Sequence, residues 1–133
     1  MSKSIIYVAN TGAQNVPVGG AVNLGGVVRR FGCALDLNGN SVTIDEAGYY
    51  DVDVSVTAAP TAAGEVTVTL FNNGVAVPGA TATTTATAAD DTVSISFNAV
   101  VRVFCGANAG ALTLVLTGTA SSVANAIMVV TKL

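Results

Sequence analysis

Histidine and tryptophan are absent from this chain of 133 residues. Without histidine, a Ser–His–Asp triad and a histidine-ligated metal site are both excluded. No serine stands in a Gly-x-Ser-x-Gly motif, so an enzyme would have to work with carboxylates alone. A glycosidase would also need aromatic platforms for the sugar, and the chain has only 4 Phe and 3 Tyr. We therefore expect a protein that is not an enzyme.

Charged residues are also scarce, at 10% of the chain against about 25% in typical soluble domains. Apolar residues make up 51%. A monomer with so few charges has little to keep it soluble, and burial of surface between subunits accounts for the shortage. We expect a single domain over residues 1–133 that is an obligate oligomer.

The basic residues form no stripe and have no interleaved aromatic residues, so we do not expect nucleic acid as a partner. No apolar run reaches the roughly 18 residues of a membrane-spanning helix, so we expect no membrane as a partner either. The apolar stretch in the first ten residues is too short for the core of a secretory signal.

Cys33 and Cys105 are the only cysteines, and they lie far apart in the sequence. Two thiols without histidine do not make a metal site. A disulfide between them is one alternative and two buried, reduced thiols are the other. Because nothing in the sequence points to an oxidising compartment, we favour the reduced thiols.

The last eleven residues, 123–133, are apolar on both faces of the strand that they predict. Strand alternation places Val123, Ile127, Val129 and Leu133 on one face, and Ala124, Ala126, Met128 and Val130 on the other. A strand that is apolar on both faces is usually buried on both. In a small domain this indicates a core on one side and a second subunit on the other. The residues predicted at the subunit interface are Ile127, Met128, Val129 and Val130.

Short apolar segments separated by turn residues predict eight to ten strands and no helix. Asn38-Gly39 and Asn73-Gly74 are typical of two-residue hairpin turns. Alternation is clearest in Tyr49–Thr57, Glu65–Asn72 and Thr92–Cys105. These features predict a sandwich or a barrel.

Two segments are less regular. Val27–Leu37 is predicted as one strand with Arg29 and Arg30 at its exposed end. Ala80–Ala89 is a Thr/Ala tract that would suit disorder or a strand, and we favour a partly exposed strand followed by a loop.

Three further segments have a recognisable pattern. Residues 44–52 read IDEAGYYDV, residues 70–79 read LFNNGVAVPG and residues 126–133 read AIMVVTKL. In order and spacing they resemble the complement and tumour-necrosis-factor-like jelly-roll superfamily, in its bacterial and phage branch. Members of that branch include the C-terminal domain of exosporium collagen-like glycoproteins. One departure is Phe104–Gly110, which lacks the Gly-Asp found there in many relatives.

The resemblance implies an all-β, ten-strand antiparallel jelly-roll sandwich that forms a homotrimer. It implies no reaction. A jelly roll that begins at Met1 without a Gly-X-Y stalk is similar to virion proteins such as capsid decoration or head-fibre proteins. We therefore expect a structural protein on the virion exterior of a bacteriophage.

Three acidic pairs are candidates for chemistry. Asp45-Glu46 lies in a turn before Gly48 and is best explained by the turn itself. Asp51 and Asp53 share a strand face, where they would bind a cation, face a basic group such as Arg102, or be solvated. Asp90-Asp91 would ligate Ca²⁺ or keep a loop soluble. We favour the solvated alternative for both pairs and expect no cofactor, with Ca²⁺ as the weak candidate.

Lys3, Arg29 and Arg30 are the candidates for contact with an acidic partner such as a capsid shell protein, against a simple solvated role. The alternative function is a carbohydrate- or receptor-binding module of a tail fibre, or of a bacterial cell or spore surface. That function would use loops at one end of the domain, namely Ala58–Gly64 and Asp90-Asp91.

Overall fold

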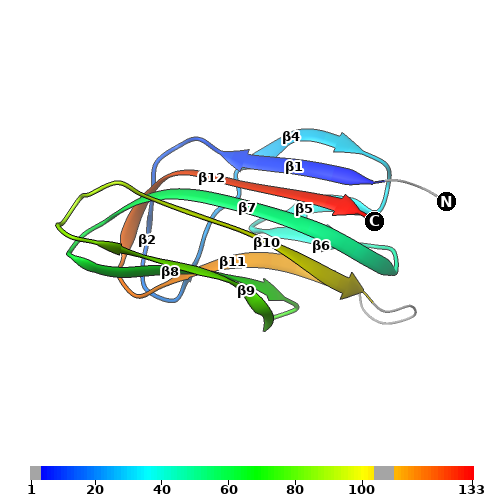
Figure 1. The fold of residues 1–133 in the computed structure, drawn as a ribbon. Helices are drawn as coiled ribbons and strands as arrows, with labels where there is room; N and C mark the ends of the chain where they lie inside the picture. Colours follow the sequence, from blue (N-terminus) through cyan, green and yellow to red (C-terminus); the bar gives the residue numbers. More distant parts are fainter. Residues whose placement is uncertain (1–3, 104–109) are drawn as a thin grey trace.

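The computed structural model describes residues 4–103 and 110–133, which form two antiparallel β-sheets packed face to face (Figure 1). These residues contain no helix, as the sequence predicts, and twelve strands, against the eight to ten expected. In this part of the chain no helix is therefore long and apolar enough to span a membrane.

Sheet A has the order β10-β7-β12-β1-β4, with the short β2 paired to β12. Its strands are β1 (Ile5–Asn10), β2 (Gln14–Val16), β4 (Gly26–Phe31), β7 (Gly48–Pro60), β10 (Val93–Val103) and β12 (Ser121–Lys132). The C-terminal strand β12 thus lies in the middle of the sheet, hydrogen-bonded to β1 on one side and to β7 on the other.

Sheet B has the order β5-β6-β11-β8-β9, with the short β3 paired to β11. Its strands are β3 (Gly20–Ala21), β5 (Leu35–Asn38), β6 (Ser41–Ile44), β8 (Gly64–Asn72), β9 (Val75–Ala86) and β11 (Gly110–Thr117). The edge strand β9 runs beside β10, the edge strand of sheet A, so this side of the sandwich is formed by one edge of each sheet.

The core lies between the sheets and consists of the inward half of each alternating strand. Every second side chain of β7, β8 and β11 is buried: Tyr50, Val52, Val54 and Val56; Val66, Val68 and Leu70; and Leu112, Leu114 and Leu116. Removing each such aliphatic side chain from water stabilises the fold by about 1.5–3 kcal/mol. The alternation predicted for Tyr49–Thr57 and Glu65–Asn72 is confirmed.

Both predicted hairpins are present, but the first turn lies one residue later than predicted. Asn73 and Gly74 have φ 53° and 81°, and two successive left-handed residues fit the type I′ turn, whose twist matches that of the flanking strands. In the first hairpin Asn38 pairs with Ser41, so the turn residues are Gly39, with φ 60°, and Asn40. These turns join β5 to β6 and β8 to β9.

The Thr/Ala tract is a strand as far as Ala86, followed by a loop, as favoured from the sequence. Thr81 and Thr83 on β9 hydrogen-bond through their hydroxyls to Thr69 and Thr67 on β8, at 3.0 and 2.7 Å. These cross-strand pairs hold the tract in the sheet.

The single strand predicted over Val27–Leu37 is wrong. The chain breaks at Gly32, which has φ 85°, so that β4 lies in sheet A and β5 in sheet B. Arg29 and Arg30 therefore lie within β4, and Arg30 is ion-paired to Asp36 on β5 at 3.4 Å. Gly32 inside the predicted strand was the signal for a break, because glycine within a strand pattern often marks a bulge or a bend.

Candidate functional site

The structure fixes which face of β12 is the core. Met128 and Val130 are fully buried between the sheets, whereas Ile127 and Val129 are half-buried on the outer face. Met128 and Val130 therefore cannot contact a second subunit, which corrects half of the predicted interface. The residues of that interface that are available to a partner are Ile127 and Val129.

The predicted grouping of Val123 with Ile127 and Val129 is also corrected. A β-bulge between Val123 and Asn125 shifts the register of β12 against β7. Because one extra residue reverses the alternation, Val123 joins Ala126 and Met128 in the core, and Ala124 is exposed.

The outer face of sheet A remains apolar around Ile127 and Val129. Ile5 and Tyr7 on β1 lie beside β12, in register with Thr131 and Val129. At the end of this face, a hollow of about 440 Å³ is lined by Ser4, Ile5, Phe31, Thr131, Lys132 and Leu133. We call the outward side chains Ile5, Tyr7, Phe31, Ile127, Val129 and Leu133 the apolar patch.

The edge strand β4 extends this patch. None of its six residues is buried, and three of them are large and apolar. The side chains of Val27, Val28 and Phe31 are 44%, 42% and 67% exposed. An edge strand with large apolar side chains and no cover invites pairing or packing with another chain. The sequence analysis did not include Phe31 and Tyr7 in the interface. The available signal was that the chain has few aromatic residues, and two of them lie in the edge strand β4 and its neighbour β1.

A pair of carboxylates lies on the same outer face, over β7. Asn98 on β10 donates hydrogen bonds from its side-chain amide to Asp51, at 2.9 Å, and to Asp53. The structure thus confirms that Asp51 and Asp53 share a face and joins them through one amide. Arg102, the basic group considered for them, instead lies over the Tyr49 ring, 5.5 Å from its centroid.

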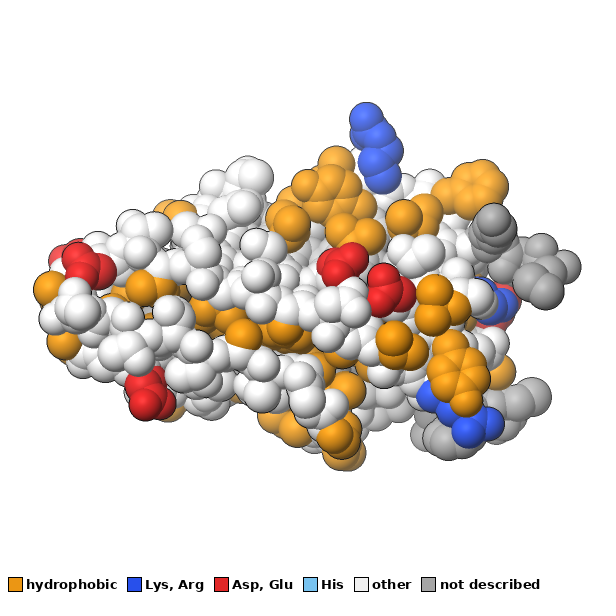
Figure 2. All heavy atoms as spheres, viewed as in Figure 1, with side chains coloured by type: hydrophobic (Ala, Val, Ile, Leu, Met, Phe, Trp, Pro, Cys, Tyr) orange, Lys and Arg blue, Asp and Glu red, His pale blue; other side chains and the backbone are white. Residues whose placement is uncertain are grey.

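Figure 2 shows these features on one side of the molecule. Acidic side chains lie in the middle, over β7 and β10, with hydrophobic side chains above and to the right of them. A basic side chain projects at the upper edge, where β4 and β1 run. Hydrophobic side chains also appear in the seam between the two sheets.

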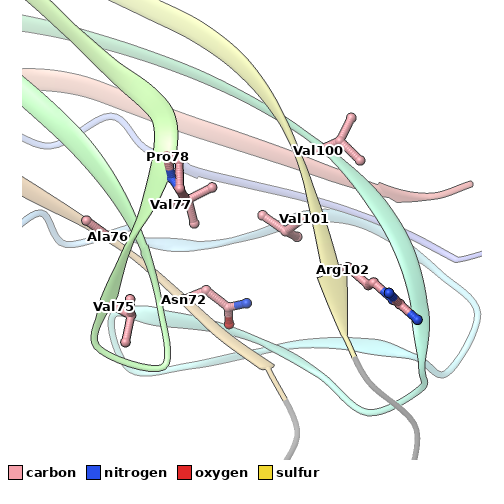
Figure 3. A pocket seen from close by; sticks show the side chains of 8 residues that line it. All are labelled: Asn72, Val75, Ala76, Val77, Pro78, Val100, Val101 and Arg102. Carbon is pink, nitrogen blue, oxygen red and sulfur yellow. The ribbon is translucent and has the colours of Figure 1, made fainter.

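That seam contains a groove of about 300 Å³ between β9 and β10. Val77 and Val101 point toward each other across it, with Asn72 below them (Figure 3). Val75 and Val100 at its rim are 69% and 53% exposed. The side-chain oxygen of Asn72 is buried and has no hydrogen-bond partner in the described residues.

The other acidic pair lies at the opposite end of the sandwich. The backbone amide of Asp90 donates to the Pro60 carbonyl at 2.8 Å, and the Asp91 carboxylate accepts from the Thr87 hydroxyl at 2.9 Å. The fold therefore brings together the two loops predicted at Ala58–Gly64 and Asp90-Asp91. The first loop is shorter than predicted, because β7 extends to Pro60. Within residues 4–103 and 110–133, no three acidic or cysteine side chains gather as a metal cluster would.

Cys33 is exposed in the turn between β4 and β5, so the expectation of a buried thiol is wrong for this residue. Cys105 lies outside the described residues, as do Lys3 and most of the Phe104–Gly110 segment. The preference for reduced thiols over a disulfide between Cys33 and Cys105 therefore stays a prediction.

A polar cluster fixes the C-terminal end of β12. Lys132 Nζ lies 2.7 Å from Glu46 Oε1, and the Tyr50 hydroxyl donates to the Glu46 carbonyl at 2.8 Å. The hydrogen bond to Glu46 raises the pKa of Lys132, while burial raises the pKa of Tyr50 and the nearby Lys132 charge partly offsets this. These groups explain the Asp45-Glu46 turn as a structural feature.

No family model matches the sequence, and no curated protein matches it. Solved structures do match in fold. Murine APRIL is 14% identical, with a TM-score of 0.72 over 99% of this chain and 100% of that chain. The globular domain of a zebrafish complement 1qA protein is 8% identical, with a TM-score of 0.66 over 95% of this chain and 94% of that chain.

The PRD1 vertex protein P5 is 11% identical, with a TM-score of 0.55 over 97% of this chain and 72% of that chain. At such identities the likeness concerns the fold alone. The predicted jelly-roll class is confirmed, while the bacterial and phage branch stays a prediction. The chain has the jelly-roll fold of the tumour-necrosis-factor-like and C1q proteins.

Proposed function

We propose that this protein is a non-enzymatic structural protein that assembles as a homotrimer through the outer face of sheet A. The observation that carries the proposal is the apolar patch. The inner face of the sheet already forms the core, yet Ile127, Val129, Tyr7 and Phe31 still point outward. A contiguous apolar surface of this kind marks a protein interface.

The number of subunits rests on the resemblance in the sequence, which implies trimers. The low content of charged residues agrees with a chain that buries much of its surface in an assembly. The β9–β10 edge supplies a second exposed apolar surface, at Val75 and Val100. Two different apolar surfaces on one chain suit a head-to-tail ring, in which one surface of each subunit meets the other surface of the next.

We further propose that the trimer is a phage virion protein, a capsid decoration or head-fibre protein on the virion exterior. The sequence resemblance supports this, and the likeness to the PRD1 vertex protein P5 agrees with it at the level of fold. Its binding to a shell would combine three weak contacts, and such avidity requires no strong single contact. Lys3 remains a candidate for one of them. The proposal requires no cofactor.

Immunogold labelling or cryo-electron microscopy of purified virions tests the virion role. We expect the protein on the head exterior. A position on tail tips would favour the alternative described next, and absence from particles would contradict a virion role.

The alternative is a carbohydrate- or receptor-binding module of a tail fibre, or of a bacterial cell or spore surface. One observation favours it: the fold places the Asp90-Asp91 loop against the end of β7, joined by the hydrogen bond from Asp90 to Pro60. Paired carboxylates in one loop cluster would suit Ca²⁺ and, through it, sugar hydroxyls. Glycan-array binding that requires Ca²⁺ and is lost in Asp90→Asn and Asp91→Asn would establish this alternative.

A further inference from the structure

The pairing of the strands arranges the outward side chains of sheet A in rows that cross the sheet. One row runs from β10 through β7, β12 and β1 to β4 as Asn98, Asp53, Val129, Tyr7 and Arg29. The next row, in the same strand order, is Val100, Asp51, Thr131, Ile5 and Phe31. Each row therefore begins at one edge of the sheet and ends at the other.

The ends of the rows are complementary. The first row has Asp53 on β7 and ends at Arg29 on β4. The second row has Asp51 on β7 but is apolar at both edges, with Val100 53% exposed and Phe31 67% exposed. The β4 edge of one copy is therefore complementary, in charge and in apolar character, to the β7 and β10 side of another copy.

Among the described residues, no ion pair joins the charged side chains of the first row to each other. Arg30, the neighbour of Arg29, is paired with Asp36. Asp51 and Asp53 have the Asn98 amide, and the Arg29 guanidinium donates to the neighbouring Val28 carbonyl at 3.0 Å. Arg29 and Asp53 are three strands apart, about 14 Å at about 4.8 Å per strand, which is too far for an ion pair.

Rotation about an axis parallel to the strands moves each residue around the axis but leaves its height unchanged. In a ring built this way, the β4 end of a row meets the β7 and β10 end of the same row in the next copy. In this arrangement, Arg29 of one copy lies opposite the carboxylates of the next copy, and Phe31 lies opposite Val100. Other axis directions would place Arg29 opposite residues of other rows.

We propose that neighbouring subunits join in this register, with Arg29 of one copy paired to the Asp51–Asp53 carboxylates of the next. The partner is a second copy of this chain, and the carboxylate site is incomplete without it. In the row below, Phe31 packs at the rim of the β9–β10 groove of the next copy, against Val100 and Val75. This assignment replaces the contact with a capsid shell predicted for Arg29.

The inference rests on the proposed homotrimer, and a charge swap tests it separately. Arg29→Glu, Asp53→Lys and the double variant are made in the full chain, and trimer dissociation is measured by sedimentation at micromolar concentrations and below. We expect each single variant to weaken association at least roughly tenfold, because like charges then face each other at every interface. The double variant should recover most of that loss, since the pair is restored with reversed sign.

Arg30→Glu is the matched control on the same strand. It makes the same change in charge, but Arg30 is paired with Asp36 inside the subunit. Asp91→Lys is the corresponding control for Asp53→Lys, in the loop before β10 and outside both rows. Both controls should leave trimer dissociation within a few-fold of wild type. Circular dichroism of every variant should show an unchanged β-sheet spectrum.

The outcomes separate the inference from the proposed function. A wild-type chain that stays monomeric overturns the homotrimer and the inference together. A wild-type trimer in which Arg29→Glu acts no more strongly than Arg30→Glu, or in which the double variant recovers nothing, overturns the inference alone. Dissociation of the wild-type trimer by EDTA, with no recovery in the double variant, would assign the carboxylates to a metal ion instead.

Discussion

Gly118, which follows β11, shows how one residue fixes the approach of two backbone segments. It has φ 90°, and a Cβ atom at this position would lie 2.3 Å from the Glu65 carbonyl oxygen. No side chain fits there without a shift of the main chain. The left-handed backbone adds strain for any residue other than glycine.

Gly118→Ala should therefore lower the free energy of unfolding by more than about 2 kcal/mol. Gly19→Ala is the control, because Gly19 has φ 80° but has open space where a Cβ would be. Gly19→Ala should lower the free energy of unfolding by about 1 kcal/mol, the cost of a left-handed backbone for a residue with a Cβ atom. Urea denaturation of both variants gives the comparison; equal losses would show that the approach to Glu65 is looser than described.

The cluster of Tyr50, Glu46 and Lys132 predicts an alkaline limit to stability. The pKa values of Tyr50 and Lys132 are both raised in the folded chain. The folded state therefore holds these protons more tightly than the unfolded state does. Stability from both groups is fully present below their unfolded pKa values, near 10, and is lost as the pH rises through the folded values.

We expect a melting temperature that is level from neutral pH to about pH 10 and falls above it. Tyr50→Phe removes one of the two titrating groups and Glu46→Gln removes the ion pair of Lys132. Each variant should show a shallower alkaline decline than wild type. Scanning calorimetry at a series of pH values measures this, and an alkaline decline identical in all three proteins would contradict it.

At the scale of elements, local sequence predicts most of the structure. The Asn-Gly hairpins and the alternation of β7 and β8 depend on residues close together in the sequence. They can therefore be predicted without knowledge of the rest of the fold. The bulge at Ala124 and the transfer from β4 to β5 depend on how distant strands pair. Gly32 marks a break in the strand pattern but does not say which sheet the chain then joins, and nothing near Ala124 encodes the bulge. The sequence prediction was wrong at both places.

The terminal strand shows the same limit for the candidate interface. Its apolar character on both faces was visible, but period-two alternation cannot say which face is the core. The structure assigns Met128 and Val130 to the core and leaves Ile127 and Val129 outside. Phe31 belongs to the same surface only because β4 pairs with β1.

Aspartate substitutions on the two faces of β12 should therefore differ in kind. Met128→Asp and Val130→Asp place an unpaired carboxylate in the core, at a cost of about 3–5 kcal/mol, and should unfold the subunit or leave it insoluble. Ile127→Asp and Val129→Asp should leave each subunit folded and prevent assembly. Circular dichroism and light scattering of the four variants check this. Folded, assembled protein in the Ile127→Asp and Val129→Asp variants would contradict the interface.

At the scale of the whole molecule, the distribution of apolar residues connects structure with function. One face of sheet A and the edge strand β4 are more apolar than the folding of a single subunit requires. Sheet B, by contrast, presents hydroxyls on its outer face at Thr67, Thr69, Thr81 and Thr83. We therefore expect the outer face of sheet A to contact other subunits and the outer face of sheet B to face solvent.

Sedimentation equilibrium of the purified full chain is the sharpest test of assembly through the outer face of sheet A. At micromolar concentration, we expect one species with the mass of three chains of 13.1 kDa each. It should dissociate only on dilution or in the variants of the outer face of sheet A. A folded, soluble species with the mass of a single chain at that concentration would contradict it.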